Sequence, residues 1–272
     1  MHRKLNWSNV LLYILLGLLI VVMMFPLYWM LISSFKDRGT ILDTNLIPCS
    51  PTLDNYRQAF QDLPLAQMLF NTFVMAFLQT ISQIIAAIGF GYALARWDFP
   101  GKRLIYFLMT LAWIVPTQAI MIPNYVQISE WKLNGNLAGM VLPSMVTVFA
   151  NLQLLEAFNS FPYSLYEASE LDGSNSWQTL KNIVVPNLAP TIASVGIISF
   201  INGWNEYLWP LLVSTSNENA TIQVGIRRYI GADVFEYGSL MAASFIACLP
   251  VLVIYTILQR QIMDNMVRGG IK

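Results

Sequence analysis

Six long apolar segments restrict what this chain can fold into. A helix needs about 20 mainly apolar residues to cross the hydrocarbon core of a bilayer. Segments of this kind lie at about 10–32, 68–95, 103–123, 136–158, 188–209 and 239–260. Within them the apolar residues run on without the alternation that membrane β-strands require. We therefore predict an all-α polytopic protein with six transmembrane helices in a membrane domain at residues 10–263.

The composition agrees with this prediction. Of the residues, 56% are hydrophobic and only 11% are charged, whereas soluble domains carry roughly 25% charged residues. The formal net charge is zero, so nothing in it indicates nucleic-acid binding. The first apolar stretch, Val10 to Ser33, is too long for a signal peptide, and no small-residue cleavage site follows it. We expect it to remain as the first span.

The distribution of Lys and Arg predicts the orientation, because cytoplasmic loops are enriched in these residues. With the N-terminus (residues 1–9) in the cytoplasm, nine of the fifteen fall inside. They are Arg3, Lys4, Arg96, Lys102, Arg103, Lys181, Arg260, Arg268 and Lys272. We predict cytoplasmic termini, with irregular outer segments at residues 34–67 and 210–238.

Cysteine and histidine are too sparse for a disulfide framework or a metal site. The chain has two cysteines, Cys49 and Cys248, and a single histidine, His2. We expect two free thiols and no metal cluster.

The segment at residues 159–187, here called the elbow, separates the fourth and fifth spans. Pro162 suits the start of a short helix and Gly173 the left-handed residue that follows its end. Ser174 can cap a second helix, which Pro186 and Pro190 end or kink before the next span. We predict two short helices joined by a sharp turn on the cytoplasmic side.

Each elbow helix has an apolar face. In the second helix, the side chains predicted to share one face are Trp177, Leu180, Ile183 and Val184. In the first helix, Leu165, Ala168 and Ser169 present small or apolar side chains to a partner. The alternative is an amphipathic linker that only lies on the membrane surface.

A motif in the elbow resembles the EAA loop of ABC importer permeases. Glu167-Ala168-Ser169 precedes Asp172-Gly173 and then Ile183-Val184-Val185-Pro186. The family pattern has Ala and Leu where this chain has Ser169 and Val185, both of similar size. The resemblance implies that the elbow is a coupling helix docked on an ATPase subunit, with Glu167 as a polar contact. The implied coupling residues are Glu167, Ala168, Ser169, Leu171, Asp172, Gly173, Ile183 and Pro186.

Further segments, spread over essentially the whole chain, resemble the second permease subunit of maltose-type importers. They include residues 26–29 (PLYW), 93–96 (ALAR), 204–211 (WNEYLWPL) and 269–272 (GGIK). The resemblance implies a carbohydrate-type solute, a bacterial inner-membrane location and an assembly. Its other members are a second related permease, two nucleotide-binding ATPase subunits and an extracytoplasmic solute-binding protein.

The chain lacks the phosphate-binding loop of an ATPase. At its only Gly-Lys pair, Gly101-Lys102, the next residue is Arg103 instead of Ser or Thr, and Arg96 replaces the first Gly. We therefore expect no ATP hydrolysis by this chain and no cofactor in it. ATP and Mg would bind to the partner subunits.

The spans carry amides and hydroxyls but no ionisable residue at their centres, which disfavours an ion-coupled carrier. A membrane-embedded enzyme also lacks support, since no nucleophile–base pair is visible. The candidate residues for a path for a neutral polyhydroxyl solute are Gln79, Gln83, Asn151, Asn202, Asn205 and Glu206. The alternative role for these residues is hydrogen bonding between helices.

The C-terminal segment 264–272 is basic, and we predict a cytoplasmic tail there. Arg268, Gly269, Gly270 and Lys272 could reach the ATPase subunits and regulate them. The alternative is a frayed terminus. Sugars, glycosides, polyols and glycerol-phosphate compounds all remain open as the solute.

Overall fold

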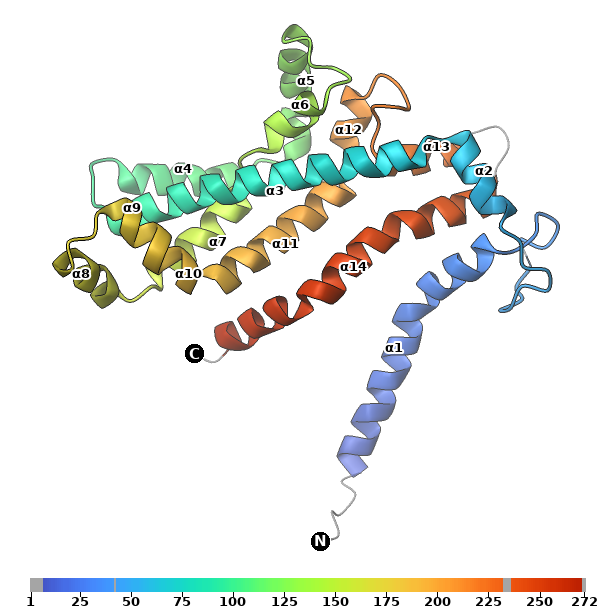
Figure 1. Ribbon diagram of the computed structural model, residues 1–272, viewed down its shortest axis with the longest axis horizontal. Helices are drawn as coiled ribbons and strands as arrows, with labels where there is room; N and C mark the ends of the chain where they lie inside the picture. Colours follow the sequence, from blue (N-terminus) through green and yellow to red (C-terminus); the bar gives the residue numbers. More distant parts are fainter. Residues whose placement is uncertain (1–6, 42, 232–235, 271–272) are drawn as a thin grey trace. The chain divides into compact units, whose positions relative to one another are not determined.

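In the computed structural model, described over residues 7–41, 43–231 and 236–270, the described chain is helical, with no strand (Figure 1). It divides into two compact units. The first contains residues 1–65 and 225–249, and the second contains residues 66–224 and 250–272. The all-α prediction is confirmed.

Within the described residues, three helices are continuous and apolar enough to cross a membrane. They are α1 (Trp7–Ser34), α3 (Leu65–Arg96) and α14 (Tyr237–Gly270), which match the first, second and sixth predicted spans. α3 has 32 residues and is therefore about 48 Å long, more than the roughly 30 Å hydrocarbon core. The helix must therefore tilt in the bilayer or extend beyond the hydrocarbon. α14 continues as a helix through Gly270, so most of the predicted tail belongs to this helix, while Lys272 lies outside the described residues.

The other three candidate spans are bent helix pairs. They are Lys102–Ile114 with Thr117–Glu130, Leu137–Ser144 with Val148–Asn159, and Ser176–Asn187 with Ala189–Asn205, bent by 94°, 46° and 76° respectively. A count of six spans requires each pair to count as one span. The predicted third and fourth spans, at 103–123 and 136–158, each contain one of these bends.

Proline causes the sharpest of these breaks. Helix α4 (Lys102–Ile114) ends at Val115, whose backbone is extended (φ −73°, ψ 117°). Pro116 disfavours the helical conformation at the residue before it. The chain then turns into η1 (Thr117–Ile120) and α5 (Met121–Glu130).

The second unit has a buried core towards each end of α3. One core joins Met75 of α3 to Met140 and Val141 of α6 (Leu137–Val141), and to Trp209 and Val213 of α12 (Leu208–Val213). The other lies beneath the elbow and joins α3 to α7 (Val148–Asn159) and α11 (Ala189–Asn205). α12 lies in the predicted outer loop 210–238, as does α13 (Ile222–Gly231), so that segment is more regular than expected.

Two glutamines of α3 support the broken fourth span. Gln79 donates from Nε2 to the carbonyl of Met140 over 3.1 Å, and Gln83 donates to the carbonyl of Ser144 over 2.7 Å. The two donors are four residues apart on α3, and the two acceptor carbonyls are four residues apart on α6 and η2 (Leu142–Ser144). One turn of α3 therefore lies alongside one turn of the broken span and donates to it at both ends. Where a helix is interrupted at membrane depth, the freed carbonyls need such partners.

The first unit is organised around Asn55 of α2 (Asp54–Asp62). Its buried amide donates to the carbonyls of Ser34 and Lys36, over 3.0 and 2.7 Å. This ties the end of α1 to α2. Where the structure describes it, the segment at residues 34–67 contains one short helix, α2, and is otherwise irregular up to the start of α3. The thiols of Cys49 and Cys248 are free.

We predict that Gln83→Leu lowers the free energy of unfolding by about 1 kcal/mol, because it leaves the Ser144 carbonyl without its donor. Thermal unfolding of the purified protein in detergent measures this. The matched control is Gln153→Leu on α7, an exposed amide, which should unfold at the wild-type temperature. Equal midpoints for the two variants would contradict the supporting role of Gln83.

Candidate functional site

The elbow contains α8 (Tyr163–Leu171), α9 (Ser176–Thr179), η3 (Leu180–Val184) and α10 (Val185–Asn187). The prediction of two short helical segments around a glycine is therefore confirmed. Pro162, the predicted first helical residue, is the N-cap of α8, so the helix begins one residue later than predicted.

The turn between α8 and α9 depends on Gly173. Its φ is +77°, in the left-handed region that side chains other than glycine's rarely adopt. The amide of Gly173 donates to the Glu170 carbonyl and that of Ser174 to the Ser169 carbonyl, each over 3.0 Å. This pair of hydrogen bonds is a Schellman motif, which satisfies the last carbonyls of a helix. A β-carbon at Gly173 would meet no atom within 4 Å, so only the backbone conformation requires glycine.

The cap of the second segment differs from the prediction. Asn175, and not Ser174, is the N-cap of α9, and it forms a capping box with Gln178. Leu180 and Val184 are buried as predicted, but Trp177 is 69% exposed. Leu180 and Val184 lie in η3, a π-helix, whose wider turns change the spacing of residues along one face relative to the α-helical turn of α9. Trp177 therefore does not share their face.

Ser169 lies inside the elbow rather than on its outer face. It is 2% exposed, and its hydroxyl contacts that of Thr179 over 2.9 Å and donates to the Tyr166 carbonyl over 2.8 Å. The prediction that Ser169 faces a partner was wrong, because its small polar side chain links α8 to α9 instead.

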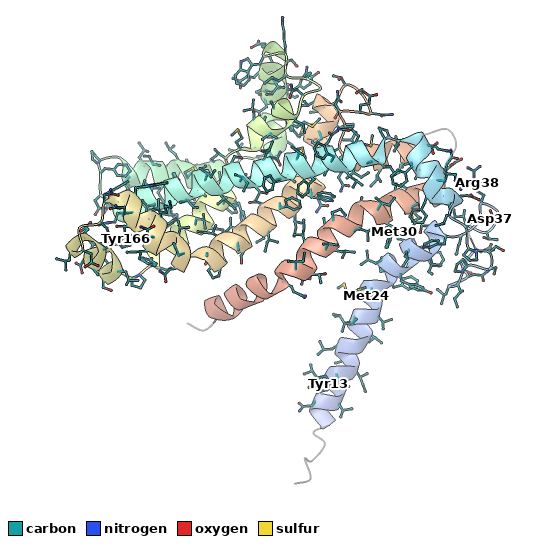
Figure 2. The ribbon with its side chains drawn as sticks, viewed as in Figure 1. Tyr13, Met24, Met30, Asp37, Arg38 and Tyr166 are labelled. Carbon is teal, nitrogen blue, oxygen red and sulfur yellow. The ribbon has the colours of Figure 1, made fainter. Side chains whose placement is uncertain are left out.

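The ring of Tyr166 fixes the inner face of the elbow (Figure 2). It is 4% exposed, and its centroid lies 6.2 Å from that of Tyr92 on α3 and 5.3 Å from that of Phe161. Tyr92 also reaches Phe158 of α7, at 6.1 Å, and donates from its hydroxyl to the Ser176 carbonyl over 3.2 Å. Burial raises the pKa of the Tyr166 hydroxyl to about 12. This hydroxyl has no hydrogen-bond partner in the described part of the chain.

Arg96, the last residue of α3, adds a polar link to the same helix. Its guanidinium forms an ion pair with Glu170 and donates to the Tyr163 hydroxyl over 3.3 Å. It also lies 5.4 Å and 5.3 Å from the ring centroids of Tyr163 and Tyr166. A guanidinium at this distance from a ring is attracted to its face. The sequence did not indicate Arg96 or Glu170 as site residues.

The outer face of the elbow is exposed and partly apolar. Leu171 is 89% exposed, and the side chains of Leu165, Glu167, Ala168 and Asp172 are exposed as well. Ile183 is half-buried, and Pro186 is exposed at the start of the bend into α11. The elbow thus has an inner face held by the helices of the second unit and an outer face without a partner in the described chain.

The residues predicted for a solute path do not form one group. Gln79, Gln83 and Asn151 are buried, and the two glutamines donate to backbone carbonyls. Asn202 and Asn205 are exposed on α11. Glu206 caps α11, and its carboxylate accepts from the Trp209 amide over 3.2 Å. Their role in a path remains a prediction.

Comparisons with known proteins agree on one family. A model described as binding-protein-dependent transport system inner membrane component matches residues 87–267. The sulfoquinovosyl glycerol transport system permease protein SmoH of Agrobacterium fabrum is 32% identical over 264 residues, which are 96% of this chain and 93% of that protein. The diacetylchitobiose uptake system permease protein NgcG of Streptomyces coelicolor is 29% identical, over 92% of this chain and 84% of the relative.

A third relative is the sn-glycerol-3-phosphate transport system permease protein UgpE of Escherichia coli O157:H7. It is 30% identical, with 96% of each chain covered. Among solved structures, a chain of a bacterial ABC transporter involved in the import of the acidic polysaccharide alginate superposes with a TM-score of 0.84. It is 20% identical and covers 96% of this chain and 98% of that one. At this identity the likeness concerns the fold.

We predict that Tyr166→Ala lowers the free energy of unfolding by about 3 kcal/mol, because it leaves a cavity among the rings of Tyr92 and Phe161. Tyr166→Phe keeps the ring and removes only a buried hydroxyl without a partner, so its stability should be equal or slightly higher. Thermal unfolding, with hydrogen exchange of the α8 amides, measures both. A destabilised Phe variant with a wild-type-like Ala variant would contradict the packing role.

Proposed function

Because the chain belongs to the family of binding-protein-dependent transport system inner membrane components and is a permease subunit of an ATP-driven importer, we propose that its elbow docks on an ATPase subunit. We further propose that the solute is a sugar or a related polyhydroxyl compound. A second permease, two ATPase subunits and an extracytoplasmic binding protein complete the importer. As a multi-pass inner-membrane protein, the chain would have both termini in the cytoplasm.

The observation that supports coupling is the contrast between the two faces of the elbow. Its inner face is joined to α3 by the Tyr92–Tyr166 contact and the Arg96–Glu170 ion pair, and to α7 through the core beneath it. A displacement of α8 must therefore move the ends of these helices, since packed interiors transmit strain. The exposed outer face, with Leu171 and Glu167, supplies the apolar and charged contacts for docking.

ATP and Mg would then act only on the partner subunits, whose closure would push on the elbow. The helices would switch between inward- and outward-open packing as a rigid-body transition. Arg268, Gly269, Gly270 and Lys272 remain candidates for a regulatory contact with the same subunits.

The solute class is proposed from the relatives. The names of three of them concern diacetylchitobiose, sulfoquinovosyl glycerol and sn-glycerol-3-phosphate, each of which carries at least two hydroxyl groups. Uptake of radiolabelled glycosides, polyols and glycerol phosphate into proteoliposomes with the complete importer, its binding protein and internal ATP tests this class. Uptake restricted to amino acids, peptides or inorganic ions would contradict it.

We expect Gly173→Val to remain in the membrane but to uncouple ATP hydrolysis from uptake, because valine is strained at the positive φ of the turn. Gly173→Asn is the matched control, since asparagine tolerates this conformation, and it should retain uptake. The measurement is solute transported per ATP hydrolysed by the reconstituted importer. Normal uptake by the valine variant would rule out a coupling role for the turn.

We expect Leu171→Asp to weaken retention of the ATPase subunits by about tenfold, the effect of losing one buried leucine contact. The side chain is exposed in the isolated chain, so stability of the membrane part should not change. Pull-down of the ATPase subunits at graded concentrations measures the affinity. Ile47→Asp, at an exposed apolar residue of the first unit, is the control. An equal affinity for both variants and wild type would argue against docking through Leu171.

A further inference from the structure

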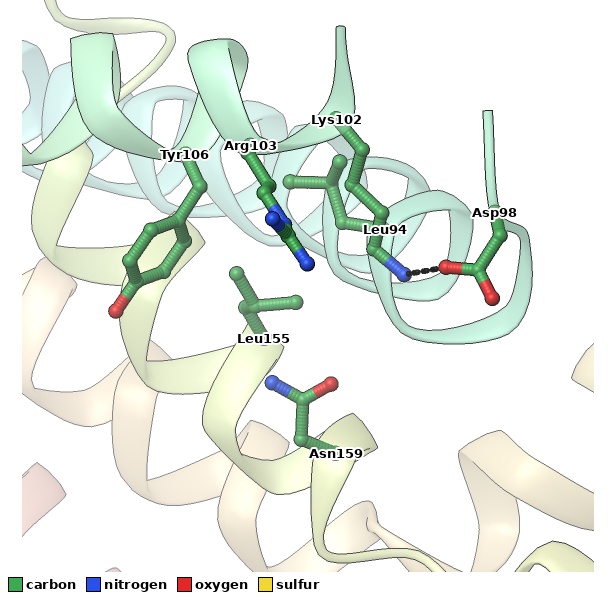
Figure 3. A pocket seen from close by; sticks show the side chains of 7 residues that line it. All are labelled: Leu94, Asp98, Lys102, Arg103, Tyr106, Leu155 and Asn159. Atoms are coloured by element: carbon green, nitrogen blue, oxygen red, sulfur yellow. Dashed lines mark hydrogen bonds and ion pairs between the residues drawn. The ribbon is translucent and has the colours of Figure 1, made fainter. Parts of the chain in front are cut away.

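A cavity of about 330 Å³ lies between the α3–α4 turn and the end of α7 (Figure 3). Its lining residues are Leu94, Asp98, Lys102, Arg103, Tyr106, Leu155 and Asn159. Asn159 is the last residue of α7, and the chain passes from it into α8. The cavity and the elbow are therefore at the same end of the second unit, but the cavity shares no residue with the Tyr166 and Arg96 contacts.

The charges in this cavity do not balance. Lys102 donates from Nζ to Asp98 Oδ1 over 2.8 Å, and this hydrogen bond lowers the pKa of the Asp98 carboxyl. These two opposite charges offset one another. Arg103 points between Lys102 and Tyr106 towards Leu155 (Figure 3), and no hydrogen bond or ion pair joins it to another described residue. The cavity is left with one net positive charge.

The position of both cations on α4 adds to this imbalance. Lys102 and Arg103 are the first two residues of the helix, whose first turn contains no acid. Gly101, the N-cap, has a φ of 92° and offers no side-chain cap. The helix dipole favours negative charge at this end, so two cations here oppose it. A bound anion would relieve the conflict.

The surface beside the cavity is apolar. Beyond Arg103, helix α4 has no buried residue, and Leu104, Phe107, Leu108 and Leu111 are between 43% and 58% exposed. A free phosphate would satisfy the cations but leave this surface unused. A ligand with an anionic head and hydrocarbon chains matches both features. Basic pockets between membrane helices are known to select such headgroups.

We propose that this cavity binds the phosphate headgroup of an anionic phospholipid from the leaflet nearest the elbow. Arg103 is the principal charged ligand, Tyr106 and Asn159 have side chains able to donate hydrogen bonds to phosphate oxygens, and the acyl chains lie along α4. The proposal goes beyond the coupling function and depends only on the placement of this chain in a membrane.

The test uses the complete importer reconstituted in nanodiscs that contain phosphatidylcholine with a minority of phosphatidylglycerol. After extraction into detergent, the phosphatidylglycerol retained per complex is quantified by mass spectrometry. We expect Arg103→Gln to lower it about fivefold, the contribution of one basic side chain near a lipid surface, and Arg103→Lys to retain most of it. Lys181→Gln, which removes an exposed cation of η3 outside the cavity, should change nothing.

A variant that should increase lipid retention distinguishes an effect on binding from an effect of misfolding. Asp98→Asn removes the competing carboxylate and should raise the retention of phosphatidylglycerol, which a damaged fold would not do. Equal retention by wild type and Arg103→Gln would overturn the proposal. It would also be overturned if inorganic phosphate bound in an Arg103-dependent way without any retained lipid. The absence of retained phosphatidylglycerol from the wild-type importer would overturn it as well.

Discussion

Tyr166 lies where a short helix of the elbow meets the ends of two long helices of the second unit. Its ring contacts Tyr92 of α3 and Phe161 at the entrance of α8, and Arg96 lies over the same ring while it pairs with Glu170. The packed rings resist compression, and the ion pair fixes the orientation of α8 relative to the end of α3. Because Glu170 is largely exposed, the ion pair contributes little to the free energy of unfolding. The elbow can transmit movement because, with these contacts in place, α8 cannot shift without also moving the end of α3.

The packing of α8 on α3 also explains why the inward-facing and outward-facing residues of the elbow have different roles. Residues that face inward, such as Ser169 and Val184, maintain the relation of α8 to α9 and to the spans. Residues that face outward, such as Leu171 and Glu167, are free to contact a partner. Gly173 lies at the turn between α8 and α9. Its left-handed backbone reverses the chain there without placing a side chain on either face of the elbow. The chain is a permease subunit, and we propose that its contribution to an ATP-driven importer is this transmission of movement.

Much of this arrangement could be predicted from the sequence. Hydrophobic length located α1, α3 and α14, and the proline and glycine positions bracketed α8, because these signals are local. The breaks near Val115 and Met145 were missed, since a long apolar run conceals a bend within it. The face of Trp177 was misassigned because the residues that follow α9 form a π-helical turn, which changes the periodicity. The face of Ser169 was misassigned because its hydroxyl contacts that of Thr179 within the elbow. Likewise, the match of Gln79 and Gln83 to two carbonyls sixty-one residues away, and the contact of Arg96 with Glu170, depend on tertiary structure that no local pattern records.

We propose that the elbow and the helices beneath it move as one body. Spin labels at position 164, an exposed residue of α8, and at position 153 of α7, in a chain with Cys49 and Cys248 replaced by serine, report the separation of these two helices in the complete importer. A label pair between this chain and the second permease reports the transition itself. On ATP binding, double electron–electron resonance should show a changed distance between the labels on the two permeases. The distance between the labels on α8 and α7 should stay unchanged. A shift in the distance between 164 and 153 that accompanies ATP binding would show that α8 moves independently of α7, which contradicts transmission through the elbow.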